Sequence, residues 1–373
     1  MENGNTQQPS PSTRVVRLDP PSLHTSTILK KSACVRPMRE RCFNISLEEI
    51  PKKKIVNCYG MGGSGWTTLF GSVGKAIRLL EDKSNPIRVI GAGCMGLTAA
   101  IELVRQGYKV TGITAKELYD IASWRAGGYF AFVSLLTSPE EQANLDAIGF
   151  ETFYAFRSIY EGSHPYLSRD CLRFLPVYGS SRTDIGLDTL EKEGLLPPSE
   201  NVILDFGAIQ HPGYTAHMTY FLDTVMIMKQ LGAEVKRLGI PIEIQEVHSW
   251  DEIAEETIFN CSGLGGRELN KDSAIIPVRG HLLLLNDTAG KAHMDYIIYT
   301  TVEQSHQEEY IYLFPKSSSA SSEIPDGFPC QGVLGGSFIP HTDKLTEREL
   351  MELDEFEFEK MLSRSQRFFY GIK

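Results

Sequence analysis

"PIRVIGAGCMGLTAAIELVRQGYKVTGIT", from Pro86 to Thr114, decides the fold. The stretch predicts a short buried strand over 87–90, a glycine turn, an amphipathic helix over about 95–106 and a second strand over 108–114. Strand, helix and strand in this order form one βαβ unit. Such a unit is typical of a doubly wound α/β sheet of the Rossmann type.

The glycine turn has the spacing G-x-G-x-x-G of a dinucleotide site. Gly91 permits a tight turn, Gly93 lets the backbone approach a pyrophosphate, and Gly96 lets the helix pack closely on the strand. The unpaired N–H groups at the start of the helix face the same anion. Ala92 and Met95 lie between these glycines and complete the predicted pyrophosphate site.

The acidic residue that usually ends the second strand and binds the adenosine ribose is missing. Thr114, Ala115 and Lys116 stand there instead, so the ribose is held either by Glu117 or by the backbone. The missing acidic residue weakens the case for NAD more than the case for FAD, because a tightly bound FAD is contacted by several distant segments. A nicotinamide dehydrogenase remains the alternative.

The composition describes an ordinary globular chain of 373 residues with a net charge of −10. Its longest basic run is Lys52–Lys54, so nucleic acid and an anionic membrane are poor partners. No apolar run approaches the roughly 20 residues that a membrane span requires. Residues 1–28 begin with MENGNTQQPSPST and predict a disordered leader without a secretory signal. We therefore expect a cytoplasmic protein.

The cysteines are scattered and contain no C-x-x-C pair. The sequence therefore predicts neither a disulfide framework nor a metal site, as is typical of a reducing compartment. The seven cysteines are Cys34, Cys42, Cys58, Cys94, Cys171, Cys261 and Cys330.

The second half of the chain contains further elements of the predicted sheets. TIFNCSGLGGREL (257–269) predicts a late strand and a small-residue turn on the adenosine side of the dinucleotide. YIYLFPK (310–316) and QGVLGGSF (331–338) predict two antiparallel strands, the first with alternate aromatic side chains on one face. An apolar helix is expected over 216–231.

Taken in order, these motifs resemble the FAD-dependent D-amino-acid oxidase family. The resemblance depends on GAGCMG, then WRAGGYF (124–130), EVHSWDEIAEETIFNCSGLGGREL (246–269), PVRGH (277–281), YIYLFP and VLGGS (333–337), and it spans most of residues 87–340. It implies a Rossmann-type FAD-binding domain joined to a substrate domain built on a mixed or antiparallel sheet. FAD is the cofactor that the resemblance implies.

Several residues gain a role through this resemblance. The matching segments place a flavin-adjacent turn at Ala126, Gly127 and Gly128, and a substrate-pocket tyrosine at Tyr312. In the segment 246–269, three residues match those that bind the adenine and ribose side of the cofactor in the family. These are Val247, Cys261 and Ser262.

The motifs that end the family's chain stand near the start of this one. In the family, an R-P-x-R segment and a motif Y-G-x-G-G-x-G-x-T follow the L-G-G strand. Here Arg36-Pro37-x-Arg39 and Tyr59-Gly60-x-Gly62-Gly63-x-Gly65-x-Thr67 precede the βαβ unit, and a helix is expected over 73–80. This order predicts a circular permutation with a moved segment over 29–86. The join would lie between about Tyr370 and about Leu29, since termini of a compact domain often lie close together.

Arg36 is the predicted carboxylate-binding residue, because a guanidinium offers two parallel charge-assisted hydrogen bonds to a carboxylate. With Tyr312 and Gly63 it forms the predicted catalytic group. Backbone N–H groups of the leading glycine stretch are expected to face the pyrimidine end of the isoalloxazine, where negative charge develops on reduction. They belong to Gly62, Gly63, Gly65, Trp66 and Thr67.

By resemblance, the reaction is oxidative deamination of a D-amino acid with oxygen to a 2-oxo acid, ammonia and hydrogen peroxide. Two alternatives stay open: a related oxidase of the glycine, sarcosine or D-aspartate type, and a degenerate non-catalytic flavin-binding protein. The chain is also compatible with a homodimer. His211, His217 and His281 are expected to be structural rather than catalytic.

The expected domains interleave along the chain. A FAD-binding domain is expected over 29–149 and 236–275, and a substrate domain over 150–235 and 276–345. A C-terminal helix is expected over 346–373.

Overall fold

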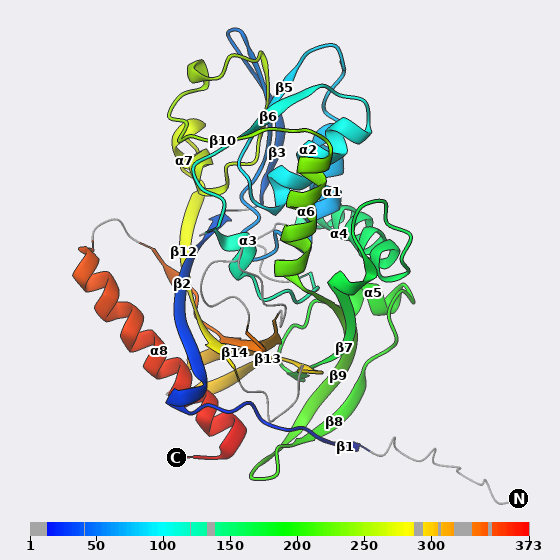
Figure 1. Ribbon diagram of the computed structural model, residues 1–373. Helices are drawn as coiled ribbons and strands as arrows, with labels where there is room; N and C mark the ends of the chain where they lie inside the picture. The colour runs from blue at the N-terminus through cyan, green and yellow to red at the C-terminus, as the bar shows by residue number, and fades with distance from the viewer. Residues whose placement is uncertain are drawn as a thin grey trace, which may run out of the picture.

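The computed structural model describes residues 13–40, 42–119, 121–132, 139–286, 294–304, 307–316, 330–341 and 345–372. Within these residues the strands form a six-stranded and a ten-stranded sheet (Figure 1). The helices are α1 (Leu69–Ile77), α2 (Cys94–Arg105), α3 (Ala122–Arg125), α4 (Pro139–Tyr160), α5 (Asp188–Lys192), α6 (Thr224–Arg237), α7 (Gly266–Leu269) and α8 (Glu347–Tyr370).

The six-stranded sheet is the predicted dinucleotide-binding sheet. In spatial order its strands are β10 (Ile242–Ile244), β6 (Val110–Ala115), β5 (Ile87–Ile90), β11 (Thr257–Asn260), β4 (Lys53–Tyr59) and β3 (Asn44–Ile50). All neighbours in it are parallel except β3 and β4. The Rossmann-type α/β fold class is therefore confirmed, with β5, α2 and β6 as its βαβ unit.

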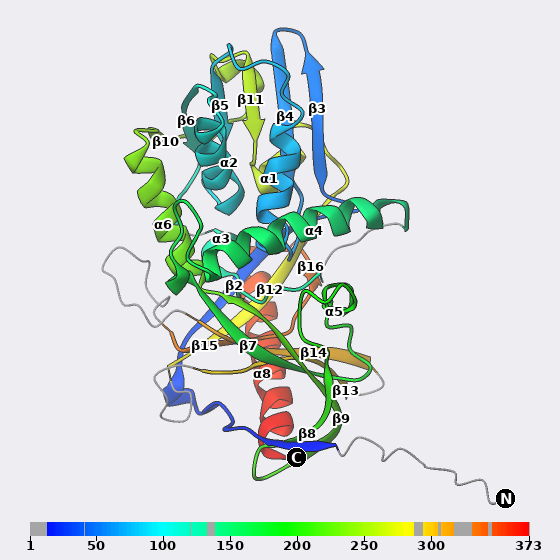
Figure 2. The same cartoon turned by 90° about the vertical axis from the view of Figure 1, so that its right-hand side faces the viewer.

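β4 lies inside this sheet although it precedes the βαβ unit in the chain. It pairs in parallel with β11, in the register Val56 to Phe259 and Asn57 to Asn260. The helix that follows it, α1, packs against α2 on the same side of the sheet (Figure 2). The leading segment thus supplies a strand and a helix to the dinucleotide-binding sheet.

The larger sheet is mixed and carries the segments expected to bind substrate. In spatial order its strands are β1 (Arg14–Arg17), β8 (Glu200–Asp205), β9 (Gln210–Leu222), β7 (Leu172–Ser180), β13 (Ile297–Gln304), β14 (Gln307–Pro315), β15 (Gly332–Gly335), β12 (Ile275–Leu285) and β16 (Ile339–Pro340). β2 (Ile28–Arg39) also pairs with β12, antiparallel along nearly its whole length. The predicted antiparallel strands at 310–316 and 331–338 are confirmed as β14 and β15.

Two helices occupy distinctive places around the sheets. α4 contacts both α1 and β7, and therefore lies between the six-stranded sheet's helices and the larger sheet (Figure 2). α8 runs along the outside of β2 and β12 (Figure 1). It occupies the segment in which a C-terminal helix was expected.

Four sequence-based expectations differ from the structure. Residues 14–17 of the expected leader form β1, which pairs in parallel with β8, while residues 1–12 lie outside the described part. β2, expected in the FAD-binding domain, belongs to the larger sheet because it pairs with β12. The expected helix over 216–231 is a strand up to Leu222, because Asp223 caps α6 through the N–H of Met226 and so sets its start. α1 also begins earlier than the expected helix over 73–80.

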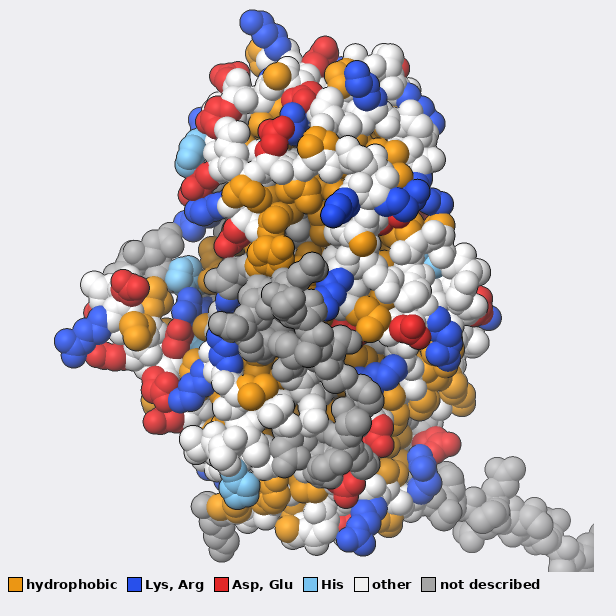
Figure 3. All heavy atoms as spheres, in the orientation of Figure 1, with side chains coloured by type: hydrophobic (Ala, Val, Ile, Leu, Met, Phe, Trp, Pro, Cys, Tyr) orange, Lys and Arg blue, Asp and Glu red, His pale blue; other side chains and the backbone are white. Residues whose placement is uncertain are grey.

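Two features of the described residues concern binding to nucleic acid and to membranes. Acidic and basic side chains are interspersed over the described part of the face in Figure 3, without a continuous basic surface there. Among the described helices, none combines the length and the apolar character that crossing a membrane would take.

Candidate active site

The turn between β5 and α2 is packed so tightly that only glycine fits at two positions. Gly91 has a φ of 101°, and a Cβ there would lie 2.4 Å from the carbonyl oxygen of Cys261. A Cβ on Gly96 would lie 1.9 Å from the carbonyl oxygen of Gly91. These contacts hold the start of α2 against the end of β11, which is the geometry of a dinucleotide turn.

Two observations show that this turn fits a dinucleotide. The N-cap residue of α2 is Gly93, which has no side chain to cap the N–H groups of the first turn. The hydroxyl oxygen of Ser262, just beyond β11, is buried and has no hydrogen-bond partner among the described residues. Ala92 and Met95 are buried in the same turn. The turn and Ser262 would therefore hold the pyrophosphate side of the cofactor.

The leading glycine stretch lies beside this turn. Trp66 donates its ring N–H to the carbonyl oxygen of Ser123 at 3.2 Å. The hydroxyl oxygen of Ser123 accepts from the N–H of Cys94, the first residue of α2, at 3.0 Å. Ser123 thus joins the glycine stretch to the pyrophosphate turn. The same stretch contains Gly63, which is exposed, and Thr67, which is buried.

Packing within the chain explains one glycine of this stretch but not another. The N–H of Gly62 donates to the carbonyl oxygen of Pro37 at 2.9 Å, and a Cβ on Gly62 would lie 2.1 Å from the sulfur of Met38. A Cβ on Gly65 would meet only the Cβ of Met61, at 4.0 Å, among the described atoms. A cofactor lying against the backbone would account for glycine at position 65.

The turn expected beside the flavin packs against the larger sheet. A Cβ on Gly127 would lie 2.1 Å from the ring of Phe314 on β14. A Cβ on Gly128, which has a φ of 87°, would lie 2.1 Å from the carbonyl oxygen of Leu222 on β9. Together with Ala126, these residues lie where the aromatic side of the larger sheet meets α3.

Lys316 is a buried residue of this region that sequence reasoning missed. Its ammonium group donates to the carbonyl oxygens of Trp124 and Ala126 at 3.0 and 2.5 Å, and to the hydroxyl of Thr224 at 2.6 Å. Burial lowers the pKa of Lys316 to about 8. Lys316 therefore fixes the turn after α3 to the end of β14 and the start of α6. The sequence holds no signal for this, because most lysines are exposed.

Arg36 and Tyr312, which were predicted to act together, are in contact. The Arg36 guanidinium donates to the hydroxyl oxygen of Tyr312 at 3.1 Å and to the carbonyl oxygen of Ser337 at 3.2 Å. Its central carbon lies 4.7 Å from the ring centroid of Phe338, and a Cβ on Gly280 would lie 2.4 Å from it. In the described part of the chain, Arg36 forms no ion pair with a carboxylate. Its charge is held by neutral groups, as a residue that binds an external carboxylate requires.

Tyr312 belongs to an aromatic group on one face of β13 and β14. Its ring stacks on Phe314 with 4.7 Å between centroids and 7° between planes. Tyr299 contacts both Phe314 and Tyr310, so the predicted alternation of aromatic side chains on one face is confirmed. Burial raises the pKa of Tyr312 in spite of the neighbouring Arg36, so its hydroxyl stays protonated at neutral pH.

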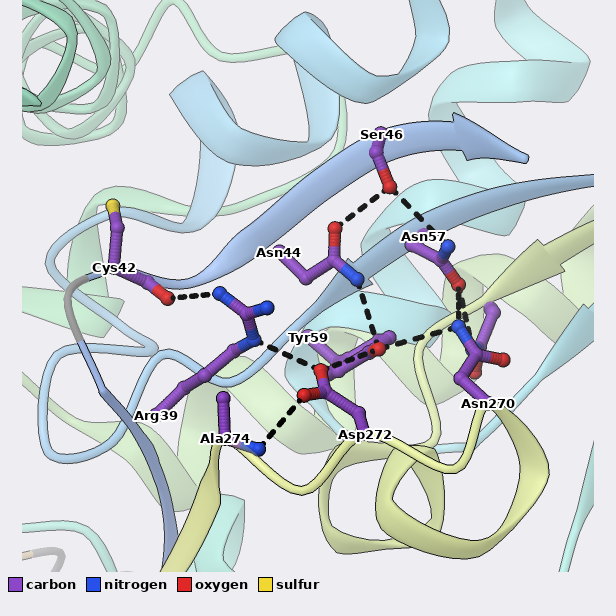
Figure 4. A network of polar contacts seen from close by, with 10 residues as sticks. Arg39, Cys42, Asn44, Ser46, Asn57, Tyr59, Asn270, Asp272 and Ala274 are labelled. Carbon is purple, nitrogen blue, oxygen red and sulfur yellow. Dashed lines mark hydrogen bonds and ion pairs between the residues drawn. The ribbon is translucent and has the colours of Figure 1, made fainter.

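A separate polar network surrounds Tyr59, the last residue of β4, where the glycine stretch begins (Figure 4). The Tyr59 hydroxyl donates to the carboxylate of Asp272 at 2.9 Å and accepts from the amide of Asn44 at 2.8 Å. The Nε of Arg39 donates to the same carboxylate oxygen at 2.8 Å. Burial, with a smaller contribution from Asp272, raises the pKa of Tyr59 to about 12. We call these residues the Tyr59 network.

The network extends along the parallel strands β4 and β11. The side-chain oxygen of Asn57 accepts from Asn260 at 2.9 Å and from Asn270 at 2.8 Å. The amide of Asn57 donates to the hydroxyl of Ser46 at 3.3 Å (Figure 4). These bonds fasten the leading segment to the segment that follows β11.

The three residues predicted on the adenosine side lie in two places. The N–H of Cys261 donates to the carbonyl oxygen of Ile90 at 2.8 Å, so Cys261 and Ser262 lie beside the pyrophosphate turn. Val247 is partly buried beyond β10 and packs against an apolar cluster that includes Ile90 and Trp250. The role of all three toward a cofactor stays a prediction.

The three histidines expected to be structural are hydrogen-bonded inside the protein. His211 contacts the carbonyl oxygen of Phe368 at 2.8 Å, and His217 contacts the carboxylate of Glu191 at 2.6 Å. His281 is fully buried between two polar side chains. No group of three or more His, Cys, Asp or Glu residues that could hold a metal ion occurs in the described ranges.

The C-terminal end of α8 lies against the segment that precedes β2. The Tyr370 hydroxyl at the end of α8 donates to the carbonyl oxygen of Pro21 at 2.5 Å, and Gln366 donates to the carbonyl oxygen of Leu23 at 3.3 Å. The chain from Leu23 leads directly into β2. Tyr370, one side of the predicted join, therefore lies beside the segment that leads to Leu29, the other side. The permutation itself stays a prediction.

A Rossmann-type sheet with a dinucleotide turn, joined to a mixed sheet that carries an arginine–tyrosine pair, is typical of cofactor-dependent oxidoreductases. Within this class the family is shown by comparison. The family model described as "FAD dependent oxidoreductase" matches residues 87–372, and the chain belongs to this family. The match begins at β5 and leaves out the segment that contains β4, the glycine stretch and α1.

Several curated relatives are similar to parts of the chain. A D-amino acid oxidase of Dugesia ryukyuensis is 24% identical over 62% of this chain and 67% of its own length. A D-amino-acid oxidase of Dictyostelium discoideum is 33% identical over 22% and 25%, and D-aspartate oxidase 2 of Caenorhabditis elegans is 27% identical over 58% and 65%. The chain thus spans between a quarter and about two thirds of the length of these relatives.

One of the similar solved structures is an L-amino acid deaminase from Proteus vulgaris. It is 13% identical, with a TM-score of 0.42, over 69% of this chain and 61% of its own.

Proposed function

We propose that the chain binds FAD and oxidises a D-amino acid with oxygen and water to a 2-oxo acid, ammonia and hydrogen peroxide. One observation carries the proposal. Arg36 has no internal carboxylate partner among the described residues, contacts the hydroxyl of Tyr312, and lies on β2, which is bonded to the glycine stretch through Pro37 and Gly62. A carboxylate-binding group is thereby tied to the dinucleotide-binding sheet.

In this proposal Arg36 binds the substrate carboxylate through two parallel hydrogen bonds, and the Tyr312 hydroxyl helps to orient them. The aromatic group of Tyr299, Tyr312 and Phe314 excludes water and packs against the substrate side chain. Bound FAD supplies the electron acceptor for the hydride that leaves the substrate Cα. The backbone N–H groups of the glycine stretch would stabilise negative charge at that acceptor. Hydrolysis of the resulting imino acid by water releases ammonia.

The comparisons support this choice among amino-donor substrates. The relatives named above that match more than half of this chain are a D-amino acid oxidase and a D-aspartate oxidase. The internal hydrogen bonds of His211, His217 and His281 also favour a mechanism based on orientation rather than on a histidine base.

The test is an anaerobic reduction screen of the FAD-loaded protein. Loss of flavin absorbance with D-amino acids and not with their L-enantiomers supports the proposal. Reduction only by glycine or N-methyl amino acids would replace it with an amine oxidase of the glycine or sarcosine type, and reduction only by D-aspartate with a D-aspartate oxidase. A protein that binds FAD but is reduced by none of them would be a non-catalytic flavoprotein.

A further inference from the structure

The turn Gly336–Phe338, between β15 and β16, supports Arg36 from two sides. The carbonyl oxygen of Ser337 accepts a hydrogen bond from the Arg36 guanidinium at 3.2 Å, and the ring of Phe338 lies under the same guanidinium. Gly336 has a φ of 143°, and a Cβ there would lie 2.0 Å from the carbonyl oxygen of Tyr310. The turn therefore has one conformation that packs against β14, and this conformation sets where the Arg36 guanidinium lies.

The other side of this turn is held by His281. The hydroxyl oxygen of Ser337 lies 2.8 Å from Nδ1 of His281 and accepts from the main-chain N–H of His281 at 2.8 Å. Nε2 of His281 lies 2.9 Å from the carboxylate of Asp354 on α8. Because an ionised carboxylate only accepts, Nε2 carries a proton and donates a hydrogen bond to the carboxylate of Asp354.

Asp354 is itself held in the ionised form. Arg279 donates two hydrogen bonds to its carboxylate, at 2.6 and 2.5 Å. Burial would raise the pKa of Asp354, but the hydrogen bonds from Arg279 and His281 hold it below its ordinary value. A chain of hydrogen bonds therefore runs from α8 through Asp354, His281 and Ser337 to Arg36.

A second contact from α8 reaches the same turn. Arg364, which is buried, donates to the carbonyl oxygen of Gly336 at 3.4 Å and forms an ion pair with Glu309 on β14. Glu309 is also paired with Lys360, one turn earlier on α8. The turn is thus attached to α8 at both Gly336 and Ser337.

The alternation of side chains along the strands explains why this linkage passes through a turn. Arg279 and His281 point to the face of β12 that α8 covers, and Gly280 between them lies on the opposite face, against Arg36. On β2, Lys31 pairs with Glu355 of α8 and lies on the opposite face from Arg36. α8 and Arg36 are therefore on opposite faces of the β2–β12 pair, and the turn Gly336–Phe338 connects them.

We propose that His281, Ser337 and Asp354 are positioning residues that make carboxylate binding by Arg36 depend on the docking of α8. The proposal rests on the proposed function, because it needs Arg36 to bind a carboxylate. Carboxylate binding and α8 docking are then coupled, and by thermodynamic reciprocity each stabilises the other.

The experiment titrates the FAD-loaded protein with benzoate and with its neutral amide, benzamide, and follows the flavin absorbance. Ser337→Ala and Asp354→Asn are expected to raise the Kd of benzoate about tenfold, with the Kd of benzamide changing less than about twofold. Ser337→Thr keeps the hydroxyl and is expected to restore most of the benzoate affinity. Glu352→Gln is the matched control, because it removes an exposed ion pair of α8 with Arg348.

Arg36→Ala separates the two levels of the hypothesis. If Arg36→Ala weakens benzoate binding while Ser337→Ala and Asp354→Asn bind benzoate as the wild type does, the positioning role is wrong and the proposed function stands. If Arg36→Ala also binds benzoate as the wild type does, the proposed carboxylate site is wrong.

Hydrogen exchange of the wild-type protein tests the coupling without a substitution. Benzoate is expected to slow amide exchange over residues 354–364 of α8, and benzamide is not. Equal exchange of α8 with and without benzoate, in a protein that binds benzoate, would overturn the proposal even if the variants fail to fold.

Discussion

Arg36 and Arg39 belong to one motif and one strand, β2, yet their surroundings are opposite. Arg39 is paired with the carboxylate of Asp272, whose side chain is 10% exposed, and donates to the carbonyl oxygen of Cys42. Arg36 contacts only the neutral oxygens of Tyr312 and Ser337 among the described hydrogen-bonding groups. The difference separates a charge that is neutralised inside the protein from one that is kept for a ligand.

The largest effect is expected at Arg36. Arg36→Ala should raise KM for D-alanine about 100-fold, because a charge-assisted pair of hydrogen bonds to the carboxylate is lost. The FAD content should stay unchanged, and the free energy of unfolding should change by less than about 1 kcal/mol. The KM of Arg36→Lys should lie between those of the wild type and Arg36→Ala, since an ammonium group keeps the positive charge but cannot donate two parallel hydrogen bonds. If Arg36→Ala has the KM of the wild type, Arg36 does not bind the substrate carboxylate and does not differ from Arg39 in this respect.

Arg39 should behave in the opposite way. Arg39→Ala leaves the Asp272 carboxylate without its cation and is expected to lower the free energy of unfolding by about 2–3 kcal/mol, with KM within about twofold of the wild type. Urea unfolding measures the first quantity and steady-state kinetics the second. In a protein that already carries Asp272→Asn, Arg39→Ala should lower the free energy of unfolding by less than it does in the wild type. A large rise in KM with unchanged stability would show that Arg39 serves the ligand instead.

Acid titration sharpens the comparison further. Burial would raise the pKa of Asp272, but Arg39, Tyr59 and the N–H of Ala274 hold it below its ordinary value of 3.8. As the pH falls towards 3.8, the unfolded chain therefore binds more protons at this site than the folded protein does. The ionised carboxylate stabilises the folded protein fully at a pH above the pKa of the unfolded chain, and this stabilisation is lost as the pH falls through the lower pKa of the folded protein. The stability difference between wild type and Asp272→Asn should shrink from about pH 5 to about pH 2.5. A constant difference would contradict the Arg39–Asp272 pairing.

The smallest effect is expected from moving the leading segment. Both arginines lie in the segment 29–86 that the predicted permutation moves, so a chain with residues 21–86 attached after residue 372 must rebuild both sites. Because Tyr370 lies next to Pro21, a short linker should join them with little strain. FAD content and the KM for D-alanine should match the wild type within about threefold. A relocated chain that folds without binding FAD would contradict the prediction that element order is free.

Sequence reasoning located the elements whose signals are local. The G-x-G-x-x-G turn, β5, α2 and β6 follow from one continuous pattern, and Arg36 and Tyr312 follow from motifs of the resemblance. The position of the glycine stretch beside the dinucleotide turn also followed from motif order, and Ser123 provides the contact between them.

The parts that were missed depend on long-range pairing. β2 joins the larger sheet through eleven residue pairs with β12, and nothing in its own sequence specifies that partner. Ala216–Leu222 has an apolar character that suits helix and strand equally, and only Asp223 marks the boundary. Lys316 donates to backbone carbonyl groups of a distant segment, and Ser337 accepts from the distant Arg36 through its own backbone carbonyl, so their residue types give no signal.

The central claim is that Arg36 binds the substrate carboxylate next to the flavin. It is tested most directly by comparing anaerobic flavin reduction by D-alanine and by D-alaninamide, in the wild type and in Arg36→Ala. The account predicts that the wild type is reduced at least about 100-fold faster by low concentrations of D-alanine than by its amide, and that Arg36→Ala loses this preference. Equal reduction of the wild type by both compounds, or an unchanged preference in Arg36→Ala, would contradict it.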